Sequence, residues 1–410
     1  MGHQDSQKRK PKSVAGADII SNLPDSVKDK ILCSLPIKEA VQTCLLSSKW
    51  RYTWASMTEL RLRDDDFALG NHDEDGYFWA GGVNKLIYFT NKFLFLHNGP
   101  ILEFQLNSQW GDMLLKGGHI DRWILMLSRK GIKGIQIWAN LPWKHKFPST
   151  FFSCDQLEHA YLQGCDFQLP PRFKGFKHLH TLHLECFHAL GNSIGDLVAS
   201  CPNLEKLTLS RFHSITDINI KSTKLKTLTV DGTFKHLNLR APHVTSAAIR
   251  LPVYIDTAPR AGRDIKFFQS IGSLSNIENI TLLGQASEYA SRGTLPRKMP
   301  ILFNRLTEIT LEIGLGNFKE AQAAHCLFQN APNLQRLRLQ LICRGSAIVP
   351  ASHFWDSIDR QELGFLKLLL EDAPILRKVK IKDNGKLDVE SLKHILKMRR
   401  TSKDAEVIVL

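Results

Sequence analysis

Residues 23–54 read LPDSVKDKILCSLPIKEAVQTCLLSSKWRYTW, and this stretch decides how the N-terminal part of the chain folds. Leu23-Pro24-Asp25 predicts the start of a helix, because proline suits the first helical turn and an acidic residue is favourable near the positive end of the helix dipole. Pro36 ends that helix and opens a second one. Ser47 or Ser48 can cap a third helix that places Trp50 and Trp54 four residues apart.

Each expected helix has one apolar face at helical spacing. The first face comprises Val27, Ile31, Leu32 and Leu35, and the second comprises Ile37, Val41, Cys44 and Leu45. A segment of this length is too short to bury a stable core alone. Part of its apolar surface therefore needs cover from another part of the chain or from another protein.

From about residue 100 the periodicity changes to a hexad in which apolar residues stand first, fourth and sixth, L-x-x-L-x-L. Most intervals between successive hexads are close to the roughly 20–29 residues of leucine-rich repeats. The eleven hexads begin at residues 101, 132, 157, 179, 204, 225, 244, 277, 306, 334 and 376.

Each hexad predicts a short strand whose fourth and sixth residues point the same way, into a stack. One such unit cannot bury its own apolar face, so neighbouring units must stack into a curved solenoid. The residues between the apolar ones then lie on the concave face. FKHLNL at 234–239 predicts an additional short strand. An unrelated α/β protein with many short buried strands is the alternative, but such folds favour longer continuous apolar strands.

Residues 23–54 resemble an F-box, whose pattern is matched by both Leu-Pro pairs, by apolar residues between and after them, and by Trp50, Arg51 and Trp54. An F-box followed by irregular leucine-rich repeats is similar to the plant F-box/leucine-rich-repeat family, which often has a C-terminal FBD domain. Residues 362–381, ELGFLKLLLEDAPILRKVKI, resemble the FBD pattern, and TSKDAEVIVL at 401–410 resembles its closing strand.

The expected fold class is α/β, a short three-helix F-box followed by a curved solenoid. The boundaries are a basic tail at 1–17, the F-box at 18–57 and a connector with the start of the solenoid at 58–100. The leucine-rich repeats cover 101–342, and an FBD-like region at 343–410 completes the solenoid.

The resemblance implies a substrate-recognition subunit of an SCF-type ubiquitin ligase, in which the F-box docks on a Skp-type adaptor and, through it, on a cullin-RING scaffold. Helix-face recognition of this kind depends on a few large anchors. The expected adaptor-binding residues are Leu23, Pro24, Ile31, Leu35, Pro36, Val41, Leu45 and Trp50. The alternative for any of them is inward packing against the first repeat.

The concave face is the expected surface for a target protein. Its candidate residues are His183, Lys206, Arg336, Arg338, Lys378 and Lys380. Because the last two pairs are wholly basic, an acidic segment of a target would be steered there. The alternative is that these charges only keep the protein soluble.

Other kinds of function have little support. No P-loop or nucleophile elbow occurs, so we expect no catalysis and no cofactor. The histidines within residues 177–188 could hold a metal, but repeat packing explains that stretch better, and we expect no metal. The net charge of +14 permits nucleic-acid binding, yet no reading motif with interleaved aromatic residues is present. A non-degradative repeat scaffold is the second hypothesis.

The bulk features indicate an intracellular protein. No apolar run approaches a membrane span, and the N-terminal residues have no apolar signal region. The eight cysteines form no CxxC pair, which favours a reducing compartment. KRKPK at 8–12 is either a nuclear localisation signal or a solvated terminus. We expect the protein in the nucleus, the cytoplasm or both.

Overall fold

The structure is a computed structural model. It describes residues 19–67, 78–139, 146–164, 166–189, 191–212, 215–252, 267–291, 302–315, 318–343, 375–382, 402 and 405–410. The basic tail at 1–17 and the helix expected from residue 362 of the FBD-like region lie outside these residues.

A sheet of thirteen parallel strands runs through the described chain, in the order β1-β2-β3-β4-β6-β8-β10-β12-β13-β14-β15-β16-β17. Each of the eleven predicted hexads contributes one strand, and β1 and β17 extend the sheet at its two ends. The strands are β1 (Glu59–Arg63), β2 (Glu103–Ser108), β3 (Gly134–Ala139), β4 (His159–Gln163), β6 (Thr181–Glu185), β8 (Lys206–Phe212), β10 (Thr227–Gly232), β12 (Ser246–Leu251), β13 (Asn279–Gly284), β14 (Glu308–Leu315), β15 (Arg336–Cys343), β16 (Lys378–Lys382) and β17 (Glu406–Val409).

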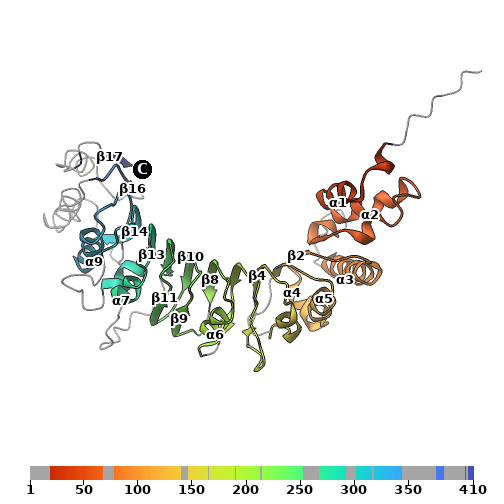
Figure 1. Cartoon of the computed structure of the whole chain (residues 1–410), viewed down its shortest axis with the longest axis horizontal. Coiled ribbons are helices and arrows are strands. Elements are labelled where there is room, and N and C mark those ends of the chain that lie inside the picture. The colour runs from red at the N-terminus through yellow and green to blue at the C-terminus, as the bar shows by residue number, and fades with distance from the viewer. Residues whose placement is uncertain are drawn as a thin grey trace, which may run out of the picture.

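The strands stay in register, so equivalent residues of successive repeats form continuous rows. Leu182, Leu207 and Leu228 are consecutive members of one buried row. The first residue of each hexad, such as Leu179 or Leu204, is also fully buried. Most strands alternate buried residues with half-buried or exposed ones, as the hexads predict. In Figure 1 the strands follow one another along an arc.

Helices and short strands pack on the outer side of the arc (Figure 1). The helices are α4 (Gly111–Lys116), α5 (His119–Ser128), α6 (Ser193–Ala199), α7 (Phe267–Gly272), α8 (Ala286–Ser291) and α9 (Phe318–Gln329), with the 3-10 turns η4 (Asp64–Asp66) and η5 (Ser149–Ser153). Two short parallel pairs join them, β5 (Asp166–Phe167) with β7 (His188–Ala189) and β9 (Asp217–Lys221) with β11 (His236–Arg240). Strand β11 confirms the short strand expected within residues 234–239.

The F-box begins with η1 (Ile20–Asn22) and two helices that start directly after the prolines, α1 (Asp25–Ser34) after Pro24 and α2 (Ile37–Gln42) after Pro36. The chain continues through η2 (Thr43–Leu45). The expected third helix is wrong: the chain turns from residue 48 and forms only the 3-10 turn η3 (Thr53–Ser56). This short run contains three aromatic residues and one β-branched residue, Thr53, and both types lower helix propensity.

Trp50 lies inside the F-box, which corrects its placement on the adaptor-binding face. Its side chain is 2% exposed and belongs to the same buried cluster as Leu32, Ile37 and Ala40. The short segment can thus build a small core around one large indole ring. Trp50 and Trp54 do not share one face of a helix, because no α-helix forms between them.

Helix α3 (Phe78–Leu96) packs against the last turn of the F-box. The ring centroids of Trp54 and Phe93 are 5.4 Å apart. Just beyond α3, buried His97 shares a hydrogen bond of 2.7 Å between its Nε2 and the carbonyl oxygen of Met57, and Lys130 donates to the carbonyl oxygen of His97. Burial lowers the pKa of His97, so the neutral ring serves as the donor to Met57.

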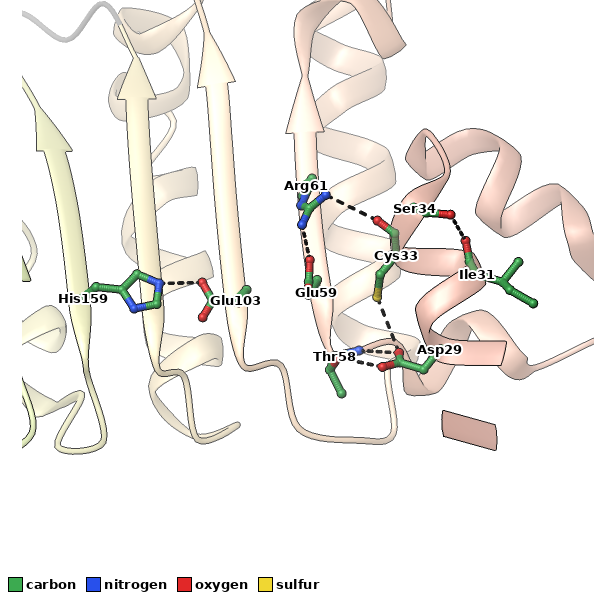
Figure 2. A network of polar contacts seen from close by, with 9 residues as sticks. All are labelled: Asp29, Ile31, Cys33, Ser34, Thr58, Glu59, Arg61, Glu103 and His159. Atoms are coloured by element: carbon green, nitrogen blue, oxygen red, sulfur yellow. Dashed lines mark hydrogen bonds and ion pairs between the residues drawn. The ribbon is translucent and has the colours of Figure 1, made fainter. Parts of the chain in front are cut away.

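A polar network fixes helix α1 to the chain entering β1 (Figure 2). The carboxylate of Asp29 accepts hydrogen bonds from the backbone N of Thr58 at 3.0 Å and from its Oγ1 at 2.8 Å. Cys33 Sγ also donates to Asp29, and Arg61 of β1 donates to the carbonyl oxygen of Cys33 at 3.4 Å. The F-box and the first strand of the sheet are therefore joined by packing and by charge-assisted hydrogen bonds.

We expect Trp50→Ala to destabilise the F-box by about 3–5 kcal/mol, because it removes the largest side chain from a small core. Hydrogen exchange within residues 19–57 measures the loss. Tyr52→Ala is the matched control, since Tyr52 is exposed and its removal should change stability by no more than about 0.5 kcal/mol. Equal exchange in the two variants would contradict the placement of Trp50.

We expect Asp29→Ala to cost about 1–3 kcal/mol locally, because it leaves the Thr58 amide without its acceptor. Faster exchange at Thr58 and along β1 is the readout. Asp65→Ala is the control. Asp65 is an exposed carboxylate that follows β1 closely in the sequence, and its removal should leave the hydrogen exchange of β1 unchanged. If Asp29→Ala also left it unchanged, the network would not be holding the F-box to the sheet.

Candidate functional site

The F-box presents two pairs of exposed apolar side chains. Leu45 and Leu46, at the end of η2, are 83% and 67% exposed, and Ile19 and Ile20, at the start of the described chain, are exposed to a similar degree. Tyr52 adds an exposed ring nearby in the sequence. Large apolar side chains exposed in such a group are typical of a protein interaction surface.

Local geometry brings the two pairs into neighbouring segments. The hydroxyl oxygens of Ser21 and Ser47 are 3.0 Å apart, and each serine directly follows one of the apolar pairs. Lys49 Nζ donates to Asn22 Oδ1 at 2.6 Å, and this second hydrogen bond joins the same two segments. Ile20 and Leu46 therefore flank one hydrogen-bonded contact between the two segments. We call Ile19, Ile20, Leu45, Leu46 and Tyr52 the F-box patch.

The tightening of the chain after α2 explains why the leucines face outward. Thr43 Oγ1 donates to the carbonyl oxygen of Ala40 at 2.7 Å, and the Leu46 amide donates to the carbonyl oxygen of Thr43 at 3.0 Å. The 3-10 geometry advances each residue further around the axis than an α-helix does. Leu45 thereby departs from the stripe that Ile37 and Val41 share.

The eight residues expected to bind an adaptor fall into three classes. Pro24, Pro36 and Leu45 are exposed, Leu23, Ile31, Leu35 and Val41 are half-buried, and Trp50 is buried. Leu35 and Val41 pack against the buried cluster. Ile19, Ile20, Leu46 and Tyr52 were missed, although the apolar pairs at 19–20 and 45–46 were a usable signal.

The strand residues between the buried ones form two rows across the sheet. In the first row His159 lies beside Thr181, Thr181 beside Lys206, and Arg336 beside Lys378. In the second row Tyr161 lies beside His183, and Arg338 beside Lys380. All six candidate target-binding residues therefore stand in these two rows, which we call the strand-face strip. Their binding of a target stays a prediction.

The end of the strip nearer the F-box combines acidic, imidazole and aromatic groups. Glu103 and His159 form an ion pair with 2.8 Å between Oε2 and Nε2 (Figure 2), and this bond raises the pKa of His159. The ring centroids of Tyr161 and His183 are 5.7 Å apart. Burial, with Lys206 and Arg211 nearby, lowers the pKa of His183.

The opposite end of the strip is less basic than its sequence indicates. Arg336 Nε donates to Glu308 Oε2 at 2.9 Å, and Arg338 pairs with the other oxygen of the same carboxylate. Lys378 pairs with Glu406 at 3.0 Å. Between these ends the second row carries small uncharged residues such as Thr229, Ala248 and Thr281. Arg336 and Arg338 share the single negative charge of Glu308, so one positive charge remains over this pair. Lys206 and Lys380 have no ion pair among the described residues and carry the other free positive charges of the six candidate residues.

The part of the chain that the structure describes contains no group of three or more His, Cys, Asp or Glu side chains able to hold a metal. Burial raises the pKa of the Cys154 thiol to about 12 and that of Cys201 to about 11, so both remain protonated and poorly nucleophilic. The described helices also include none that is long and apolar enough to cross a membrane.

Two family models match the chain. The F-box domain model matches residues 20–62, and a model described as "FBD-associated F-box protein At5g56370, LRR repeats" matches residues 120–258. The first match includes the F-box patch from Ile20 onward and reaches β1. The second covers the strands from β3 to β12.

Proteins of Arabidopsis thaliana are similar over most of the chain. F-box/FBD/LRR-repeat protein At1g13570 is 28% identical, with 96% of this chain and 98% of the relative covered. Putative F-box protein At3g58860 is 27% identical, with 96% and 88% covered. Putative F-box/LRR-repeat protein At3g58880 is 31% identical over 56% of this chain and 50% of its own length. With a match to the F-box model near its N-terminus and a match to a leucine-rich-repeat model behind it, the chain is similar to plant F-box/FBD/LRR-repeat proteins.

Proposed function

We propose that this protein is the substrate-recognition subunit of an SCF-type E3 ubiquitin ligase. F-box domains generally act in such ligases by binding Skp-type adaptors, and the chain has an F-box. The observation that carries the proposal is the F-box patch, whose leucine and isoleucine side chains remain exposed although Leu32, Ile37 and Trp50 of the F-box are buried. The ubiquitin-transfer chemistry would belong to other subunits.

The energetics favour a docking role for the patch. Full burial of a leucine or isoleucine side chain contributes about 1.5–3 kcal/mol, so a few such side chains can supply most of a protein interface. Leaving them in water has no benefit for the isolated chain. A partner that covers Leu45, Leu46 and Ile20 together would gain this free energy.

The proposed docking face keeps Leu23, Pro24, Ile31, Leu35, Pro36, Val41 and Leu45 and adds the rest of the F-box patch. Trp50 acts from inside, by holding the core on which the exposed residues rest. The Asp29 network and the α3 contacts then hold this face at a fixed place relative to the sheet. Such a connection would let the adaptor position whatever the repeats bind.

The strand-face strip of the curved leucine-rich-repeat solenoid is the proposed surface for a target protein. Its middle is lined by small uncharged side chains, which allow a polypeptide segment to approach closely. Lys206 and Lys380 would attract acidic groups at two places along it. A non-degradative scaffold that uses the repeats alone is the second candidate. It differs in predicting unchanged target abundance when the F-box patch is disabled.

We expect Leu45→Asp/Leu46→Asp to abolish co-purification with a Skp-type adaptor, because two charges would be buried in an apolar interface. Thermal unfolding should remain at the wild-type temperature, since both side chains are exposed. Leu302→Asp/Ile375→Asp is the matched control, with two exposed apolar residues replaced far along the chain. The proposal fails if full-length folded wild-type protein retains no adaptor, or if both double variants bind it equally.

The target surface can be tested by proximity labelling with the labelling enzyme fused to the Leu45→Asp/Leu46→Asp variant, in which targets should accumulate instead of being degraded. When Lys206→Glu/Lys380→Glu is added to this fusion, we expect it to label the target proteins no longer. Charge reversal at the two unpaired lysines should repel an acidic target segment. Lys221→Glu/Lys235→Glu, on or beside the outer pair β9 and β11, is the control and should capture the wild-type set. An unchanged set in the strip variant would exclude the strip as the target surface.

A further inference from the structure

A cavity opens between the turn that leads into β4 and the loop that leads into β6. Its volume is about 560 Å³, and it is lined by η5, by residues 155–156 and by residues 170–178. This volume lies within the roughly 300–1,000 Å³ of small-ligand sites. All of its lining residues precede the two strands, so none belongs to the strand-face strip or to the F-box patch.

Aromatic packing holds the walls in place. The ring centroids of Phe152 and Phe173 are 5.1 Å apart with their planes nearly perpendicular, and Phe173 contacts the buried ring of Phe176 in the same way at 5.0 Å. Gly175 has φ +86°, and a Cβ there would lie 1.8 Å from the carbonyl oxygen of Ser200 after α6. The loop can approach the end of α6 this closely only with glycine, and the cavity is therefore preformed.

The cavity has an excess of positive charge. Arg172, Lys174 and Lys177 line it, and Asp155 is the only carboxylate among the lining residues. Within the described chain these three cations have no ion pair, so three positive charges face one negative charge. Like charges gathered in one concave site attract a counter-anion strongly. The hydroxyls of Ser149 and Ser153 add hydrogen-bond donors.

We propose that this cavity binds an organic phosphate, with the phosphate held by Arg172, Lys174 and Lys177 and the carbon part resting against Phe152 and Phe173. A phosphate monoester carries up to two negative charges near neutral pH, which matches the excess of two positive charges. A monocarboxylate would balance only one of these two positive charges. The guanidinium of Arg172 suits two parallel hydrogen bonds to phosphate oxygens, and the two half-buried rings offer an apolar surface for a ring-sized body.

The same chemistry could reach the cavity from two sources, a free small molecule or a phosphotyrosine side chain of another protein. Both present a phosphate on an aromatic ring. The site is independent of the adaptor-binding proposal, because its residues lie on loops of the repeats. Adaptor co-purification, measured on the same variants, therefore separates a failure of either proposal from a failure of the other.

Calorimetric titration of the full-length protein with phenyl phosphate tests the site. We expect saturable binding of one molecule per chain, weakened about tenfold or more in Arg172→Gln/Lys174→Gln, since charge-assisted bonds are lost. Both side chains are exposed, so this variant should keep the wild-type melting temperature. Arg240→Gln/Lys221→Gln removes the same residue types from the outer pair β9 and β11 and should bind as wild type does. Absent binding in the wild type, or equal weakening in both variants, would overturn the proposal.

Three further probes define the ligand class. Benzoate keeps the ring with one charge, and inorganic phosphate keeps the charge without the ring, so both should bind about tenfold more weakly or worse than phenyl phosphate. Equal affinity for benzoate, inorganic phosphate and phenyl phosphate would mean that the site attracts anions without recognising the ring or the phosphate, and would contradict the proposal. A phosphotyrosine peptide that displaces phenyl phosphate would support a protein source, and one that does not would support a small-molecule source.

Discussion

The structure depends on one constraint, that a single short parallel strand cannot bury its own apolar residues. The row that includes Leu182, Leu207 and Leu228 is buried from solvent because the side chains of neighbouring strands pack against one another. The same constraint acts at the end of the stack, where β1 would have an uncovered side. Helix α3 and the F-box lie at that end (Figure 1), and the buried cluster of the repeats continues without a break into Leu32 and Trp50.

Much of the fold could be predicted because the hexad places buried residues at fixed spacing. Strand β1 was missed for a specific reason. Met57, Leu60 and Leu62 complete a twelfth hexad, all three are buried, and the boundary expected at residue 57 cut it in two. The third helix of the F-box was wrong because helical spacing of two tryptophans does not require a helix. Similarly, an apolar residue such as Trp50 fits a core and an interface equally well, and only packing decides between them.

The candidate site was predictable in position but not in charge. The strand-face strip lies where the alternation of buried and exposed residues places it. Pairing across strands depends on side-chain geometry, however, and Glu308 neutralises much of the charge of Arg336 and Arg338 from the neighbouring strand. The F-box patch was only half predicted, because the step from α2 into η2 turns Leu45 and Leu46 outward. The cavity proposed to bind an organic phosphate is built by loops between hexads, and loops have no periodicity that would indicate it.

The most direct measurement is hydrogen exchange of the full-length protein with and without a purified Skp-type adaptor. The account predicts slower exchange at residues 19–23 and 43–52 on binding, with β6 and β8 of the sheet unchanged. Protection confined to the repeats, or no protection within the F-box at adaptor concentrations that saturate other F-box proteins, would contradict it.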